Sequence, residues 1–242
     1  LWFVYAVTGS PLKTSVIGLL QTIPPIVLGP LIGVYVDRLP KKVLLITSDV
    51  LRALLIGLIP CLIPVESFTV SVLYVLVFLH AIATAVFGPA LTAAIPAFVP
   101  KRQFTAANAL LQGTTSLGII FGPALSGLGI AAYGSQEVLC LNAATYMVSA
   151  ALLLLVRFRN PVTPVSSPAA RSTMLQDLIE GFRYSVVTQP RLLLLTSIAA
   201  LYTFGTSALN ALFPVFARKM LGLGPVEVGY LWSALGAGNV QG

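Results

Sequence analysis

The sequence predicts an all-α protein that crosses a membrane several times. Hydrophobic residues make up 57% of its 242 residues and charged residues 9%, with a mean hydropathy of +0.95. A soluble domain carries about 25% charged residues, so this composition cannot build a water-soluble surface. The apolar residues form runs of about 20, the length of a membrane-spanning helix, without the alternation typical of barrel strands. Helices are therefore the expected spanning structure.

Six apolar runs are long enough to be whole spans, and two shorter runs at the chain ends are expected to be parts of spans. The sequence has no starting Met and stops inside an apolar run, so we interpret it as a fragment. The whole spans are expected at 15–36, 43–64, 68–87, 106–133, 138–156 and 192–216, and the partial spans at 1–8 and 228–242.

The net charge of +7 is explained by membrane topology. Of the 14 basic residues, 11 fall on one side of the alternating spans: Arg38, Lys41, Lys42, Arg52, Lys101, Arg102, Arg157, Arg159, Arg171, Arg183 and Arg191. The other side has only Lys13, Arg218 and Lys219. This bias predicts that the loops after residues 36, 100 and 156 are cytoplasmic. The lipid bilayer is the expected partner, and no basic patch interleaved with aromatic residues indicates nucleic acid.

The chain divides into two helical bundles at its longest polar stretch. We expect a first bundle at 1–157 with a truncated first helix, a cytoplasmic linker at 158–190, and the start of a second bundle at 191–242. Leu175, Leu178, Ile179 and Phe182 recur at helical spacing inside the linker. They predict a short amphipathic helix on the membrane surface. The alternative is a solvated linker helix without a regulatory role.

A conspicuous motif ends the second span: Gly33, Asp37, Arg38, Lys41 and Lys42. Glycine permits close helix approach, an aspartate can cap a neighbouring helix N-terminus, and basic residues anchor a turn on the cytoplasmic side. The spacing resembles the loop signature of the major facilitator superfamily, apart from a proline where that signature has its second glycine. The resemblance implies a conformational latch that favours the outward-open state. The alternative is a plain topology determinant.

A second motif lies in the fifth span and includes Gly118, Gly122, Pro123 and Gly127. Small residues four apart let helices pack closely, and proline removes one backbone hydrogen bond. The run resembles the antiporter motif of the same superfamily, with Ser126 replacing one glycine. This resemblance favours export over uptake. Ordinary small-residue packing is the alternative interpretation.

The wider pattern resembles the drug:proton antiporter group that includes macrolide and enterobactin exporters. Further matches are the runs 48–52, 87–90, 95–100, 105–110, 180–184 and 229–232. The resemblance implies a monomeric twelve-helix carrier of the plasma membrane that exports a small amphiphilic substrate in exchange for protons. The rivals are a lipid or lysophospholipid flippase, an uptake carrier, or a membrane scaffold or sensor without transport. No phosphate-binding loop, metal-spaced cluster or nucleophile with a base is visible, so we expect neither an enzyme nor a cofactor or metal.

A few polar residues inside the spans are candidates for coupling or for the substrate pocket. His80 is the only side chain of the fourth span that titrates near neutral pH, and an ionisable residue within the membrane is a functional candidate. Its alternative role is a hydrogen bond to a neighbouring helix. Tyr202 and Asn210 in the seventh span are the best candidates to line a pocket. Asp49 and Arg52 are three residues apart, so they are expected to form a structural ion pair.

Overall fold

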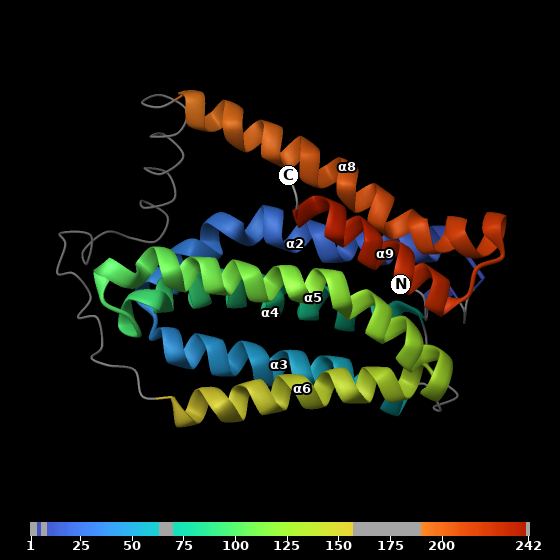
Figure 1. Ribbon diagram of the computed structural model, residues 1–242, viewed down its shortest axis with the longest axis horizontal. Helices are drawn as coiled ribbons and strands as arrows, with labels where there is room; N and C mark the ends of the chain where they lie inside the picture. Colours follow the sequence, from blue (N-terminus) through green and yellow to red (C-terminus); the bar gives the residue numbers. More distant parts are fainter. Residues whose placement is uncertain (1–3, 6–8, 63–69, 157–189, 241–242) are drawn as a thin grey trace.

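The computed structural model describes residues 4–5, 9–62, 70–156 and 190–240, and within these residues all regular structure is helical (Figure 1). Six of the described helices are long and apolar enough to cross a membrane. The all-α membrane prediction is confirmed. The helices are α2 (Pro11–Arg38), α3 (Lys41–Leu62), α4 (Val70–Ala94), α5 (Phe104–Tyr133), α6 (Ser135–Leu155), α8 (Pro190–Leu221) and α9 (Pro225–Val240). The short 3-10 turns η1 (Ile95–Ala97) and η2 (Lys101–Gln103) join α4 to α5.

The helix ends follow local chemistry. α2 begins where the Ser10 hydroxyl accepts the N–H of Lys13 and Pro11 occupies the first turn, in which a missing N–H costs nothing. α4 runs on to Ala94 and not only to residue 87, which corrects the predicted end. Pro89 does not stop it, because membrane helices tolerate proline where neighbouring groups satisfy the freed backbone. The predicted linker helix lies outside the described residues.

Helices α2, α3, α4 and α6 form one packed unit. α3 lies between α4 and α6, and α2 packs on the other side of α4. Two apolar clusters hold the unit together near its two ends. One contains Ile17, Ile59, Leu73, Leu76 and Val77, and the other contains Ile32, Val36, Leu45, Ala90 and Ala94. Large apolar side chains on the outside, such as Leu110 and Leu155, are suited to contact lipid.

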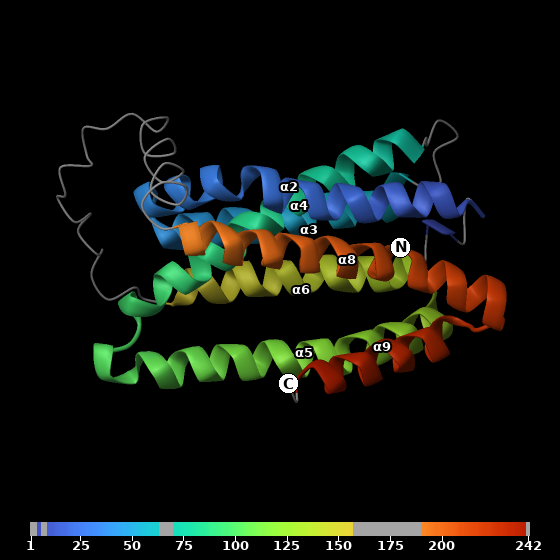
Figure 2. The same ribbon diagram turned by 90° about the horizontal axis from the view of Figure 1, so that it is seen from above.

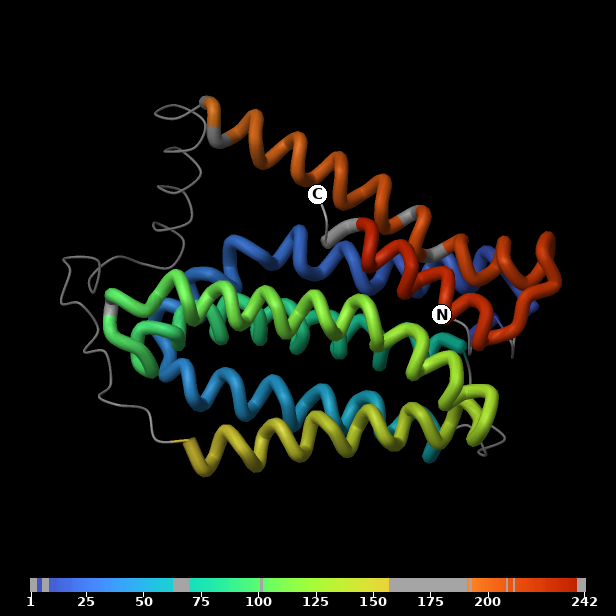
Figure 3. Tube along the Cα trace, in the orientation of Figure 1, coloured from blue at the N-terminus to red at the C-terminus, as the bar shows by residue number. Residues whose placement is uncertain are grey.

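The remaining helices make two further pairings. α5 lies beside α9, and Figure 2 shows this pair as a layer apart from α2, α3 and α4. α8 contacts α2. Figure 3 shows α8 diverging from α2 toward the end where the α2–α3 turn lies and approaching it at the other end. Residues 193–205 of α8 are correspondingly exposed. The second bundle thus meets the first away from the loops predicted to be cytoplasmic.

Candidate binding cavity between the helical bundles

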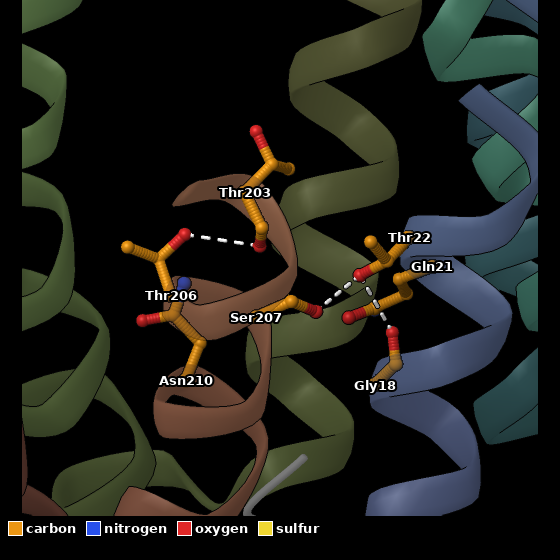
Figure 4. Close-up of a pocket in the computed structure, with 7 residues that line it drawn as sticks. All are labelled: Gly18, Gln21, Thr22, Thr203, Thr206, Ser207 and Asn210. Carbon is orange, nitrogen blue, oxygen red and sulfur yellow. Dashed lines mark hydrogen bonds between the residues drawn. The ribbon is translucent and has the colours of Figure 1, made fainter. Parts of the chain in front are cut away.

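A polar stripe on α8 faces a polar stripe on α2. Thr203, Thr206, Ser207 and Asn210 repeat at the spacing of one helix face. Opposite them, the Thr22 and Ser207 hydroxyls share a hydrogen bond across the two bundles, as Figure 4 shows. The Thr22 hydroxyl is also 2.9 Å from the Gly18 carbonyl of its own helix. Hydroxyl groups therefore form part of the contact between the two helices.

A cavity of about 190 Å³ lies among these groups, and we name it the polar cavity. Its lining carries hydroxyl and amide groups, and no ionisable side chain is among the lining residues. Such groups can both donate and accept hydrogen bonds. The described lining residues are Gly18, Gln21, Thr22, Thr203, Thr206, Ser207 and Asn210.

A second cavity of about 390 Å³ lies between α2, α5, α8 and α9, and we name it the mixed cavity. Gln21 and Asn210 line both cavities, so the two spaces share an amide boundary. The rest of the lining is mostly apolar, with the Trp232 ring edge-on to Phe213 at 5.1 Å between ring centroids. The other lining residues are Pro123, Ser126, Gly127, Ile130, Pro214, Pro225, Val228 and Gly229.

The two cavities together offer an amphipathic site. A ligand with an apolar body fits the mixed cavity, and its hydrogen-bonding groups can reach the two amides and the hydroxyls beyond them. Pockets for small ligands typically measure about 300–1,000 Å³ and combine apolar walls with a few convergent polar groups. Asn210, expected from the sequence to line a pocket, is placed at the centre of this arrangement.

Some of the antiporter-motif residues contact another helix, and others have no close neighbour among the described residues. Pro123 and Gly127 line the mixed cavity, and Gly127 packs so tightly on the Pro225 carbonyl that a side chain there would overlap it. A Cβ added at Gly118 or Gly122 would meet no atom within 4 Å. Small-residue packing therefore applies to one end of the motif.

Glycines on α9 complete this contact. A Cβ at Gly229 would lie 2.5 Å from the Pro123 carbonyl oxygen, and one at Gly236 would lie 2.8 Å from that of Ile119. Pro123 has no N–H to donate back to Ile119, so that carbonyl is free for another helix to approach. The Ala124 N–H also donates to the Ser233 hydroxyl at 3.1 Å. The backbones of α5 and α9 are thus in direct contact around Pro123, where the α9 glycines lie.

The latch-motif residues are placed at the α2–α3 turn, where the lysines have defined partners. The Lys41 ammonium donates to the carbonyls of Val36, Asp37 and Leu39, which closes the C-terminus of α2. The Lys42 ammonium donates to the carbonyls of Leu154 at 3.0 Å and Val156 at 2.9 Å, at the end of α6. Cations are favourable at helix C-termini. The turn is therefore tied to two helix ends.

Gly33 and Asp37 lack the contacts expected of them within the described part of the chain. Asp37 and Arg38 are exposed, and Asp37 caps no described helix N-terminus. A Cβ added at Gly33 would meet no atom within 4 Å, so no helix approaches closely there. The contacts of α8 and α9 with the first bundle lie toward the opposite end, away from this turn.

His80 and Tyr202 do not join the cavities. Tyr202 is 69% exposed, and it is absent from both linings. The His80 ring faces Tyr146 of α6, with ring centroids 6.1 Å apart, inside the first bundle. Asp49 and Arg52 form the expected buried ion pair beside it, which confirms their predicted pairing.

Most residues of the cavity lining are not among those expected from the sequence. The spacing of Thr203, Thr206, Ser207 and Asn210 is visible in the sequence and could have indicated a polar face. Nothing local indicates that Thr22 is its partner, or that Trp232 and Gly229 close the mixed cavity. These contacts depend on how the two bundles pack against each other.

An all-helical membrane chain with an uncharged amphipathic cavity between two bundles has the architecture of a transport protein that binds its cargo between its halves. Residues 2–242 match the sequence profile of the Major Facilitator Superfamily, and the chain belongs to that family. It is a multi-pass protein of the bacterial plasma membrane, and its relatives are transporters rather than enzymes.

Three curated relatives illustrate the similarity. The chain is 26% identical over 236 residues to Macrolide efflux protein A of Streptococcus pyogenes, covering 97% of this chain and 57% of the relative. It is 28% identical to Multidrug efflux pump Tap of Mycolicibacterium fortuitum, covering 100% and 59%. It is also 28% identical to the uncharacterized MFS-type transporter YfiS of Bacillus subtilis, covering 95% and 54%. The chain thus spans somewhat more than half the length of these relatives.

Proposed function

We propose that the whole protein exports an amphiphilic small molecule, such as a macrolide, across the plasma membrane in exchange for protons. The observation that carries this proposal is the paired cavity between the bundles, in which Gln21 and Asn210 separate a hydroxyl-lined space from an apolar one. A macrolide combines a large apolar ring with hydroxyl and carbonyl groups, so it matches both spaces. The names of two relatives support efflux as the direction of transport.

Alternating access is the proposed mechanism. In this structure α8 and α9 contact the first bundle at the end away from the basic loops, so the cargo enters from the cytoplasmic side. Rocking of one bundle against the other then breaks the Thr22–Ser207 hydrogen bond and the glycine contacts between α5 and α9. Cargo and proton must each bind one of the two states more tightly than the other for exchange to occur.

The latch and antiporter motifs are assigned roles at opposite ends of this cycle. No described helix closely approaches Gly33, and Asp37 is exposed, which suits a latch that engages when the cytoplasmic ends close. Pro123 and Gly127 are engaged now, which suits a seal on the outer side. The protein acts as a monomer in this proposal, because both cavities are lined within one chain.

Transport by the full-length protein in proteoliposomes tests the proposal. The assay follows radiolabelled erythromycin, a macrolide, with and without an imposed pH gradient, in wild type, Asn210→Leu and Tyr202→Leu. We expect gradient-dependent flux in wild type, a loss of about tenfold or more in Asn210→Leu because a polar ligand group is left unpaired, and no loss in Tyr202→Leu.

Other outcomes separate the rival functions. Movement of a fluorescent lysophospholipid between leaflets, with no erythromycin flux, would identify a flippase. Flux of erythromycin only toward the cytoplasmic side would identify an uptake carrier. If neither compound moves, transport of these classes is refuted and a scaffold or sensor role is favoured.

A further inference from the structure

A buried cluster of charged and aromatic side chains lies inside the first bundle, apart from both cavities. Asp49 and Arg52 of α3 are 1% and 7% exposed. At 1.5 Å per residue, Asp49 lies about 12 Å into α3 from its start at Lys41, which is well within the bilayer. A buried ion pair adds little net stability compared with apolar packing, so its presence at this depth calls for a function.

Asp49 is hydrogen-bonded in a way that suits both of its protonation states. One carboxylate oxygen contacts the Arg52 guanidinium, and the other accepts the Ser149 hydroxyl of α6 at 2.6 Å. A hydroxyl can rotate from donor to acceptor. If a proton binds the second oxygen, Ser149 can accept that proton's hydrogen bond without moving.

Arg52 has support that does not depend on the charge of Asp49. Its guanidinium carbon lies 4.0 Å from the Phe87 ring centroid and 4.6 Å from that of Tyr146. A desolvated cation is attracted to the negative face of an aromatic ring. The two rings therefore reduce the cost of leaving Arg52 without an ionised partner.

The surroundings make Asp49 the acidic group of this cluster. From α3 come Asp49 and Arg52, from α4 His80, and from α6 Tyr146. The ionisable residues of α2, which packs on α4, lie toward its two ends: Lys13, Tyr35, Asp37 and Arg38. Asp49 is the one carboxylate in this group of facing residues, whereas the described lining of both cavities is uncharged.

We propose that Asp49 binds the coupling proton, at a site separate from the cargo cavity. The proton adds to the carboxylate oxygen that faces Ser149, giving a neutral carboxylic acid, while Arg52 stays protonated over its two rings. The present contact suits the unprotonated site with Ser149 donating, and we assign that form to this state of the cycle. The proton-bound form then belongs to the opposite state of the cycle. This inference rests on the proposed proton exchange.

The main test replaces both charges at once in the full-length protein, because removing one leaves an unpaired buried charge. Asp49→Asn with Arg52→Gln is compared with wild type in proteoliposomes using radiolabelled erythromycin. Two rates are measured: exchange of erythromycin without a gradient, and accumulation driven by a pH gradient. We expect the neutral pair to keep exchange and to lose accumulation. Accumulation at the wild-type level in the neutral pair would overturn the proposal.

A milder variant keeps the proposal falsifiable if the neutral pair does not fold. Ser149→Ala removes a donor to the ionised carboxylate, which favours the protonated form, so the pH midpoint of accumulation should rise by roughly half a unit or more. Ser149→Thr retains the hydroxyl and should restore the wild-type midpoint. Equal midpoints for wild type and Ser149→Ala would contradict a proton at Asp49.

Two controls separate the possible failures. His80→Gln should keep gradient-driven accumulation. If His80→Gln loses accumulation while the neutral pair accumulates normally, the proton binds at His80 and the proposal is refuted. If wild type itself exchanges erythromycin but does not accumulate it, the proposed proton exchange fails. If wild type accumulates and the neutral pair does too, only the Asp49 assignment fails.

Discussion

The hydroxyl of Thr22 on α2 shares a hydrogen bond with the hydroxyl of Ser207 on α8, and this bond joins the two helical bundles. It lies beside the polar cavity, at the level where α8 comes close to α2. In alternating access, a contact between bundles must break when the cavity opens to the other side. Under the proposed mechanism, we therefore expect this residue pair to report the state of the transporter.

A covalent link between these positions should arrest transport. In a full-length background without native cysteines, including Cys61 and Cys140, we expect Thr22→Cys with Ser207→Cys to form a disulfide under oxidation. Erythromycin flux should then stop and return after reduction. Thr22→Cys paired with Tyr202→Cys is the control, since Tyr202 lies outside both linings, and it should not link. Full flux in the linked protein would show that these helices need not separate.

Enlarging a glycine at the α5–α9 contact should prevent the outer seal. Gly229→Val places atoms against the Pro123 carbonyl, 2.5 Å from the position of the new Cβ. Overpacking of this kind costs about 1–3 kcal/mol, enough for a loss of roughly fivefold to a hundredfold in occupancy of this state. Gly238→Val is the matched control, because its Cβ would meet nothing within 4 Å. Erythromycin flux and accessibility of outer-side cysteines measure the effect, and equal behaviour of the two variants would argue against the seal.

Removing the Lys42 ammonium should loosen the α2–α3 turn from the end of α6. Lys42→Met loses the hydrogen bonds to the Leu154 and Val156 carbonyls, and we expect about 1 kcal/mol of destabilisation. Thermal unfolding in detergent measures the loss. Lys13→Met, at an exposed position on the other end of α2, should be near neutral. A Lys42→Met protein as stable as wild type would show that this cap contributes nothing.

The turn between α5 and α6 should require glycine. Gly134 has φ of +99° and ψ of 164°, a region that side chains rarely adopt, so Gly134→Ala is expected to cost about 1–3 kcal/mol. Gly113→Ala inside α5 is the comparison, because it meets no neighbour and alanine favours helix. The unfolding temperature of Gly134→Ala should be well below that of Gly113→Ala. The reverse order would contradict the turn geometry.

The features that sequence predicted well are those with a local or one-dimensional signal. Span length and apolar composition predict the helices, and the three-residue separation of Asp49 and Arg52 predicts their pairing. The end of α4 was misjudged because a Gly-Pro pair is normally a helix breaker in water. In a membrane helix the same pair is tolerated.

The features that sequence could not supply depend on which helices meet. Lys42 reaches carbonyls more than a hundred positions away in the chain, at the end of α6. The α9 glycines matter only because Pro123 frees a carbonyl on α5 that Gly236 can approach. Asn210 lies in the cavity lining and Tyr202 does not, since residue type alone does not fix the side of α8 on which a side chain lies.

The most direct test of proton-driven export is the steady-state accumulation of erythromycin by the full-length protein as the imposed pH gradient is varied. One unit of pH difference supplies about 1.4 kcal/mol per proton, so exchange of one proton for one molecule predicts roughly tenfold accumulation per pH unit. The ratio should return to one when a protonophore collapses the gradient. An accumulation ratio that stays at one across all gradients, while erythromycin still crosses, would contradict the account.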